Sequence, residues 1–355
     1  MNPPFRLYGA ELSPYSVKVR SYLRFKNIPF EWLQRNQARQ EEFARFAKLP
    51  LIPVIVDADD VAMQDSTPII EALEAQFPEP SIIPDDPALA FLSALIEDYA
   101  DEWLNKAMFH YRWTYPADQE SAARRILGMM FEGAESPEGL EESIRVRMVG
   151  RLHHVGSTRE TAPAIEGSFS RVLGCIEQIL AGRSYLFGGR PSLADFGLAG
   201  QFEQLLSDPT PGALIRAQAP NLVGWVERMQ NPSVEGAFVS FAAGGGALAE
   251  FLRTEVAVAY LTWMAANADA IASDAPSVTV DITGAPFSQK PQRYAAKALA
   301  ELRSKRALVT NEALAALLGE TGCDAVLLGA VSETEPDADD DQDADGDEAG
   351  EASDA

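Results

Sequence analysis

The order of secondary-structure signals in the first 78 residues constrains the fold more than any other feature of the chain. Short apolar segments typical of strands alternate with segments of helical periodicity. Pro14 suits the first turn of a helix, where its missing N–H removes no hydrogen bond. The expected strands are FRLY (5–8), FEWL (30–33), PVIV (53–56) and VAMQ (61–64), and the expected helices are 14–26, 40–49 and 66–77, the last capped by Ser66.

The order strand, helix, strand, helix, hairpin, helix predicts a thioredoxin-like α/β domain over residues 1–80. The proline- and acid-rich segment PEPSIIPDDP follows and predicts a linker, and helical patterns dominate 87–245. We therefore expect an all-α helical-bundle domain there. A mostly helical extension is expected over 246–330, with helices at about 247–272 and 291–318 around one strand, SVTVDIT.

The net charge limits the classes of partner. The formal net charge is −24, and residues 333–355 hold twelve acidic and no basic residues, which leaves −12 on the rest of the chain. This tail has almost nothing to bury, so we expect it to be disordered. An acidic body repels phosphate backbones, which argues against nucleic acid as a partner.

Composition also bears on location. No apolar run approaches the ~18 residues that predict a membrane span, and MNPPFRLYG lacks the layout of a signal peptide. Only two cysteines occur, Cys175 and Cys323. This number fits a reducing compartment and argues against a cysteine-rich metal site. We expect a cytoplasmic protein without a membrane or metal partner.

The stretch LSPYSVKVRSYL (12–23) holds the first candidate site. Redox proteins of the thioredoxin type carry two cysteines at such a strand-to-helix turn, whereas this chain has Ser13 and Ser16. Neither cysteine of the chain lies in the first domain, so disulfide exchange is not expected. A hydroxyl at a helix N-terminus can instead stabilise the thiolate of a bound thiol, although serine is also favoured there simply as an N-cap.

Four segments in order resemble the cytosolic glutathione transferase superfamily over about residues 5–240. They are SPYSVKVRSYLRFKNIPFEW, LPLIPVIV, DSTPIIEALEAQFP and GRPSLADFGLAGQF. The resemblance implies that the protein binds glutathione, stabilises its thiolate and directs it at an electrophilic small molecule, as a homodimer. It does not separate alkyl or aryl transfer from dehalogenase, etherase or isomerase activity. The alternative is a non-catalytic binding or scaffold protein on the same fold.

The resemblance assigns roles to residues of the first domain. Ser13 is the expected hydrogen-bond donor to the thiolate, with Tyr8 and Ser16 as rivals. A cis peptide before Pro53 would let the backbone of Ile52 pair with the ligand in the manner of an added strand. Asp65 and Ser66 begin a helix whose N-terminus suits the γ-glutamyl group, although a plain serine cap is the simpler explanation of Ser66.

Two parts of the ligand site have several candidates. The family's usual residues for the glycine carboxylate are replaced by AKLPLIP, which leaves Lys48, Arg39 or Gln64. The wall for the second substrate is expected in DEWLNKAMFHYRW (101–113), whose aromatic rings suit either a pocket or a helix core. Arg112 in this segment is the expected partner of an anion or of a glutathione carboxylate. His153 and His154 are expected at the surface.

SLAD (192–195) predicts a helix start in the second domain. Ser192 and Asp195 have the spacing of a reciprocal capping box, and the following FGLAGQFEQLL is apolar on most faces, as a buried helix should be. We interpret this motif as structural.

Overall fold

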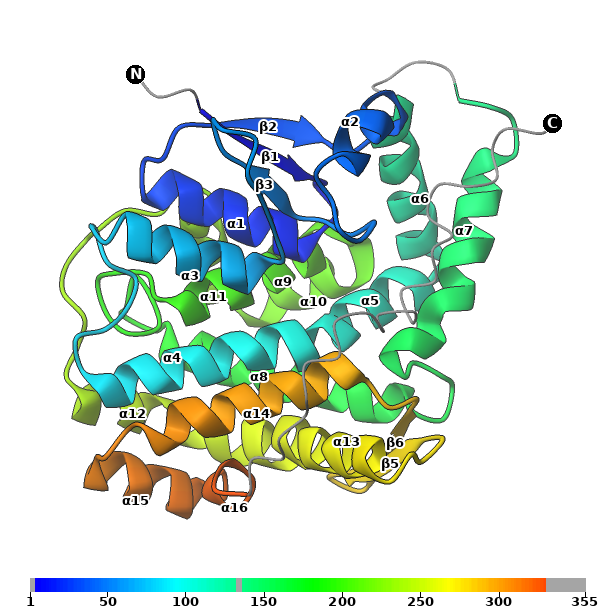
Figure 1. The fold of residues 1–355 in the computed structure, drawn as a ribbon. Helices are drawn as coiled ribbons and strands as arrows, with labels where there is room; N and C mark the ends of the chain where they lie inside the picture. Colours follow the sequence, from blue (N-terminus) through cyan, green and yellow to red (C-terminus); the bar gives the residue numbers. More distant parts are fainter. Residues whose placement is uncertain (1–3, 132–135, 330–355) are drawn as a thin grey trace.

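The computed structural model describes residues 4–131 and 136–329 (Figure 1). The first domain contains a four-stranded sheet in the order β2-β1-β3-β4, in which only β1 and β2 are parallel. This α/β arrangement confirms the thioredoxin-like prediction. Its elements are β1 (Phe5–Gly9), α1 (Pro14–Phe25), β2 (Phe30–Gln34), η1 (Gln37–Arg39), α2 (Gln40–Ala44), β3 (Val54–Val56), β4 (Ala62–Gln64) and α3 (Ser66–Gln76).

The alternation of side chains along the strands divides the domain into two cores. Leu7 and Ile55 belong to the large core that includes α1 and α3. Tyr8, Val54 and Phe43 of α2 belong to a separate small cluster. Because the side chains of neighbouring strand residues point to opposite faces, Leu7 and Tyr8 lie on opposite sides of the sheet.

The start of α3 differs from the expected serine cap. Asp65 is the N-cap residue, with φ of 79° and ψ of 136°, and Ser66 is the first helical residue. A positive φ is uncommon for a residue other than glycine. It costs conformational free energy and is kept only where the surrounding structure imposes it.

The second domain is all-helical, as predicted. Most of it lies below α1 and α3, and another part rises beside the sheet of the first domain (Figure 1). Its elements are α4 (Pro87–Tyr99), the π-helical turn η2 (Ala100–Leu104), α5 (Asn105–Thr114), α6 (Pro116–Phe131), α7 (Leu140–Gly150), η3 (Arg151–Val155), α8 (Ala162–Ile179), α9 (Leu193–Ser207), α10 (Pro209–Gln218) and α11 (Pro220–Met229).

Helix α9 lies at the centre and packs against α1, α4 and α5. Gly200 makes the contact with α1 close, because a Cβ at this position would lie 2.6 Å from the carbonyl oxygen of Pro14. The predicted capping box of Ser192 and Asp195 is present. Asp195 is fully buried and also accepts hydrogen bonds from the Leu186 amide at 2.9 Å and the Trp225 indole at 3.1 Å.

Replacement of Asp195 by alanine is expected to lower the free energy of unfolding by about 3 kcal/mol, because buried donors left without an acceptor cost ~1–3 kcal/mol each. Ser192→Ala, which removes one cap hydroxyl, is the matched control and should cost about 1 kcal/mol. Urea denaturation measures both. Equal effects of the two substitutions would contradict this account.

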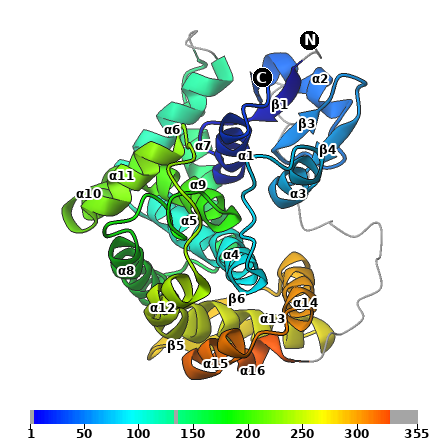
Figure 2. The same ribbon diagram turned by 90° about the vertical axis from the view of Figure 1, so that its left-hand side faces the viewer.

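The extension consists of α12 (Phe241–Phe251), the π-helical segment η4 (Leu252–Leu261), α13 (Thr262–Ala272), β5 (Val278–Ile282), β6 (Ala285–Gln289), α14 (Arg293–Ala307), α15 (Glu312–Thr321) and α16 (Asp324–Leu327). The predicted strand is β5, but it pairs with β6, which was not predicted. Figure 2 shows α14 below α3, and the ion pair Lys305–Glu71, at 2.9 Å, joins these two helices. The acidic tail lies outside the described residues.

No helix within residues 4–131 and 136–329 combines the length and apolar character needed to cross a membrane.

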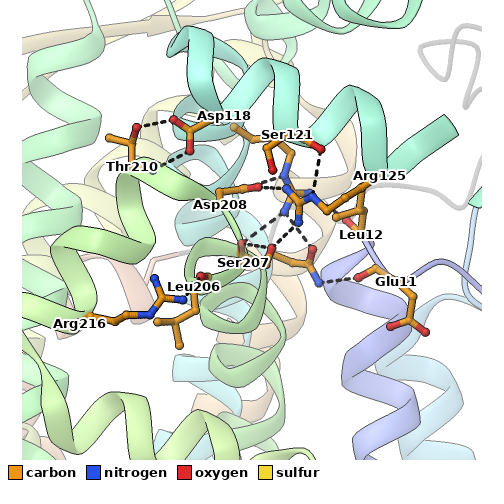
Figure 3. Close-up of polar contacts among 12 residues, drawn as sticks. Glu11, Leu12, Asp118, Ser121, Arg125, Leu206, Ser207, Asp208, Thr210 and Arg216 are labelled. Atoms are coloured by element: carbon orange, nitrogen blue, oxygen red, sulfur yellow. Dashed lines mark hydrogen bonds and ion pairs between the residues drawn. The ribbon is translucent and has the colours of Figure 1, made fainter. Parts of the chain in front are cut away.

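A buried brace holds the loop before α1 against the second domain (Figure 3). Arg112 donates to Asp208 at 2.7 Å, to the Gln204 side chain at 2.9 Å and to the Leu12 carbonyl at 3.0 Å. Gln204 in turn donates to the Glu11 carbonyl at 2.9 Å. Arg112 and Asp208 are nearly inaccessible, so the guanidinium positions the turn that leads to Ser13.

Arg112→Met is expected to lower the free energy of unfolding by about 3 kcal/mol, because the change removes one partner of a buried ion pair. Arg124→Met, at an exposed arginine paired with Glu120 on the same helix, is the control and should cost less than ~1 kcal/mol. Unchanged stability together with weaker glutathione binding would instead indicate a direct ligand contact for Arg112.

Candidate active site

A cavity of about 970 Å³ opens between the first domain, the second domain and the extension. Its walls come from three parts of the chain that are far apart in sequence. The first is made by Tyr15 with residues 46, 48, 49, 51–53, 62–65 and 68, the second by residues 101, 102 and 105 with His153 and His154, and the third by residues 290–294.

One wall of the cavity presents unpaired backbone groups. The Ile52–Pro53 bond is cis, as expected from the family resemblance, and both residues line the cavity. Within the described part of the chain, the N–H and C=O of Ile52 form no hydrogen bond. These groups are therefore available to an extended ligand backbone.

The loop that carries Ile52 is held by Gln64. Its side-chain oxygen accepts from the amides of Lys48 and Leu49, at 3.2 and 3.1 Å. Its amide nitrogen donates to the carbonyls of Leu49 and Leu51, both at 2.8 Å. Gln64 is thus fully engaged in shaping the loop. Among the three candidates for the glycine carboxylate, Lys48 lines the cavity and Arg39 does not.

Asp65 presents a carboxylate to the cavity at the N-terminus of α3. Tyr294 of the extension donates a hydrogen bond of 2.7 Å to one carboxylate oxygen of Asp65. Burial and the nearby Asp65 both raise the pKa of Tyr294, so its phenol remains a donor. The extension therefore closes the side of the cavity nearest to α3.

The ammonium of Lys18, on α1, lies behind this wall and is almost completely buried. It is hydrogen-bonded to Glu97, to Asp101 at 2.6 Å, to Thr67 at 3.0 Å and to Ser66 at 3.3 Å. Burial opposes the charge, but Asp101 and Glu97 outweigh that effect and raise the pKa of Lys18. The Ser66 hydroxyl is consequently directed into this network, and Ser66 does not line the cavity.

The three candidate hydroxyls for thiol activation have different surroundings. Ser13 is half-buried at the N-cap of α1, where its oxygen accepts from the Ser16 amide at 3.2 Å. Ser16 is fully buried, and its hydroxyl has no partner within the described chain. Tyr8 donates to Glu42 at 2.6 Å in the small cluster, and burial together with Glu42 raises its pKa to about 12. None of the three lines the large cavity.

Tyr15, which sequence reasoning did not single out, is the α1 residue that lines the cavity. Its hydroxyl donates to the Asp101 carbonyl at 3.1 Å and accepts from Asn105 at 3.2 Å. The Tyr15 hydroxyl thus joins the N-terminus of α1 to η2 and to the first residue of α5.

The segment 101–113 contributes a polar wall, not the expected aromatic one. Its cavity-lining residues are Asp101, Glu102 and Asn105. The aromatic residues Trp103, Tyr111 and Trp113 are buried in the core together with His110, and Arg112 belongs to the brace. The polar and the aromatic residues of this segment alternate with helical spacing, so they lie on different faces of the helix. Which of the two faces lines the cavity is decided by the packing of the neighbouring helices.

The extension supplies further polar groups to the cavity, which no local sequence pattern predicts. Arg293 lines the cavity with an exposed side chain, as does Lys48 on the opposite, N-terminal wall. His153 and His154 are exposed, as expected, and also border the cavity. No group of side chains suited to holding a metal ion occurs within residues 4–131 and 136–329.

Comparison with known proteins agrees with this architecture. Family models of the glutathione S-transferase N-terminal and C-terminal domains match residues 7–81 and 159–228. An isoprene-epoxide glutathione S-transferase of Rhodococcus is 27% identical over 232 residues, which cover 62% of this chain and 92% of that protein. A zeta-class glutathione S-transferase of Euphorbia esula is 33% identical over 88 residues, 24% of this chain and 39% of that one.

Among solved structures, a glutathione S-transferase of Methylobacterium radiotolerans in complex with glutathione sulfonate has a TM-score of 0.43 and 22% identity. The match covers 67% of this chain and 97% of that one. The two domain models occur in the family's order on the two domains described above, with the cis-proline and the capping box in place. The two domain models and the Rhodococcus relative together support the assignment of the chain to the cytosolic glutathione transferase superfamily.

Proposed function

We propose that the protein binds glutathione in this cavity and directs its thiolate at an electrophilic small molecule. The observation that carries the proposal is the placement of two complementary groups on one cavity. The unpaired backbone of Ile52 suits the cysteinyl unit of the tripeptide, and the carboxylate of Asp65 suits its ammonium group. A cytoplasmic homodimer is included in the proposal on the family resemblance.

The charges of the walls support the same orientation of the ligand. Lys48 lies on the Ile52 side of the cavity with an exposed side chain, so it suits the glycine carboxylate. One oxygen of Asp65 accepts from Tyr294, which leaves the other for the ligand ammonium. The first turn of α3 adds N–H groups that favour the γ-glutamyl carboxylate.

Ser13 is the proposed donor to the sulfur. It does not line the cavity itself, but it is the N-cap of α1, two residues before Tyr15, which does. Only a few per cent of a free thiol is ionised near neutral pH, and a hydroxyl at the positive end of a helix favours the thiolate. Ser16 is enclosed, and the Tyr8 and Tyr15 hydroxyls already donate to Glu42 and to the Asp101 carbonyl. The Ser13 proton has no acceptor within the described chain.

Ser13→Ala is expected to lower kcat/KM for thiol conjugation about 100-fold, by analogy with the loss of one donor to a developing or bound anion. The pKa of the enzyme-bound thiol should rise, which ultraviolet absorbance of the thiolate measures. Ser304→Ala, at an exposed serine of α14, is the matched control. A loss confined to Tyr8→Phe or Ser16→Ala would transfer the role to that residue.

Asp65→Gly is expected to weaken glutathione binding at least tenfold, because it removes the carboxylate that faces the ammonium. Glycine tolerates positive φ, so relief of the strained backbone offsets the lost contact with Tyr294. The free energy of unfolding should therefore stay within about 1 kcal/mol of wild type. Calorimetric titration and urea denaturation check the two effects.

Asp65→Asn is the companion variant, since it keeps the size and the hydrogen-bond acceptor but removes the charge. It should lose affinity to a similar extent. Wild-type affinity in both variants would exclude Asp65 from the ligand site.

A further inference from the structure

The cavity wall contains one carboxyl group that the fold leaves unpartnered. Glu102 lies on the π-helical turn η2 and lines the cavity. It makes no hydrogen bond or ion pair within the described chain, whereas its neighbours are engaged: Glu97 and Asp101 with Lys18, and Asp98 with Tyr260. Irregular π-helical turns are frequent at functional sites.

Lys106 lies one helical turn beyond Glu102 and is enclosed by aromatic rings. Its ammonium is 3.9 Å from the centre of the Trp263 ring and 5.8 Å from that of Trp103. The side chain is 2% exposed and makes no hydrogen bond within the described chain. Burial lowers the pKa of Lys106, and the charge of Glu102 partly restores it.

The charges around Glu102 favour its protonated form. Burial raises the pKa of Glu102, Lys106 lowers it, and the carboxylates of Asp101, Asp65 and Glu97 raise it further. Asp98 on α4, Tyr260 on η4 and Tyr294 on α14 also interact electrostatically with Glu102. Among these groups only Lys106 is cationic, so the proton stays on the carboxyl at a higher pH than is usual for glutamate.

We propose that Glu102 is the proton donor to the electrophile, and that the preferred substrates are those whose reaction with a thiolate leaves a negative charge on oxygen, such as epoxides. This inference rests on the proposed function. The thiolate sulfur forms a bond to an epoxide carbon, the C–O bond breaks, and its electron pair stays on oxygen. The Glu102 carboxyl gives its proton to that oxygen, and the carboxylate recovers a proton as the next thiol ionises.

Other acidic groups of the wall are less suited to this step. Asp101 is paired with the Lys18 ammonium, the Tyr15 hydroxyl donates to a backbone carbonyl, and the Tyr294 hydroxyl donates to Asp65. The two phenols would have to break an existing hydrogen bond before they could donate to a substrate, and protonation of Asp101 would remove the negative charge that pairs with the Lys18 ammonium. Lys106 is a positioning residue in this account, because it acts only through the charge state of Glu102.

Two electrophiles separate proton donation from thiol activation. Opening of styrene oxide leaves an alkoxide that needs a proton, whereas chlorodinitrobenzene expels chloride, which needs none. Glu102→Gln should lower the ratio of kcat/KM for the epoxide to kcat/KM for the aryl chloride about 100-fold, the usual scale of general acid catalysis. Glu227→Gln, at an exposed glutamate of α11, is the matched control and should leave the ratio unchanged.

The pH dependence tests the same assignment. The wild-type ratio should fall as pH rises through the raised pKa of Glu102, since the proton donor is then lost. Lys106→Met removes the charge that lowers this pKa, so the fall should move to higher pH. A profile that does not move would overturn the role of Lys106.

The inference is overturned if Glu102→Gln slows both substrates equally, or if wild type conjugates the aryl chloride but not the epoxide. It is also overturned if His153→Gln, and not Glu102→Gln, lowers the ratio. A wild-type protein that conjugates neither substrate would contradict the proposed function itself, which makes the two failures distinguishable.

Discussion

The arrangement of the candidate site depends on the hydrogen bonds and ion pairs made by the buried ammonium of Lys18. This ammonium joins α1 to α3 through Ser66 and Thr67, and to α4 and η2 through Glu97 and Asp101. A buried charge is costly unless its partners surround it, so these elements must meet in one arrangement. That arrangement places the N-terminus of α3, the ring of Tyr15 and the carboxyl groups of η2 around the same cavity.

The brace around Arg112 has a comparable role at the other end of α1. It connects Asp208 and Gln204 of the helical domain to the carbonyls of Leu12 and Glu11. The turn before Ser13 is therefore fixed by the second domain and not by the first alone. Both contacts place charge inside the interface between the domains, where the loss of one partner leaves the other buried and unpaired at a high cost.

Much of this could be predicted from the sequence, because its signals are local. The strand and helix order of the first domain and the capping box of Asp195 follow from short motifs and are confirmed. The cis bond before Pro53 was expected from the family resemblance and is confirmed as well. The roles of Ser13, Ile52 and Asp65 remain proposals. The partners of Arg112 and Lys18 lie dozens of residues away, so the sequence pattern could not reveal that these cations are already engaged. Strand β6 was missed because APFSQ has a proline and little alternation.

The wall formed by residues 290–294 has a consequence for how the site assembles. Tyr294 meets Asp65 across 229 positions of the sequence, so this part of the cavity closes only after the chain has passed through both domains and returned. A fragment limited to the first domain would carry Ile52 and Asp65 on an open surface. The cavity is therefore complete only when the extension packs against the first domain. The affinity for a ligand in this cavity should depend on how stably the extension is packed there.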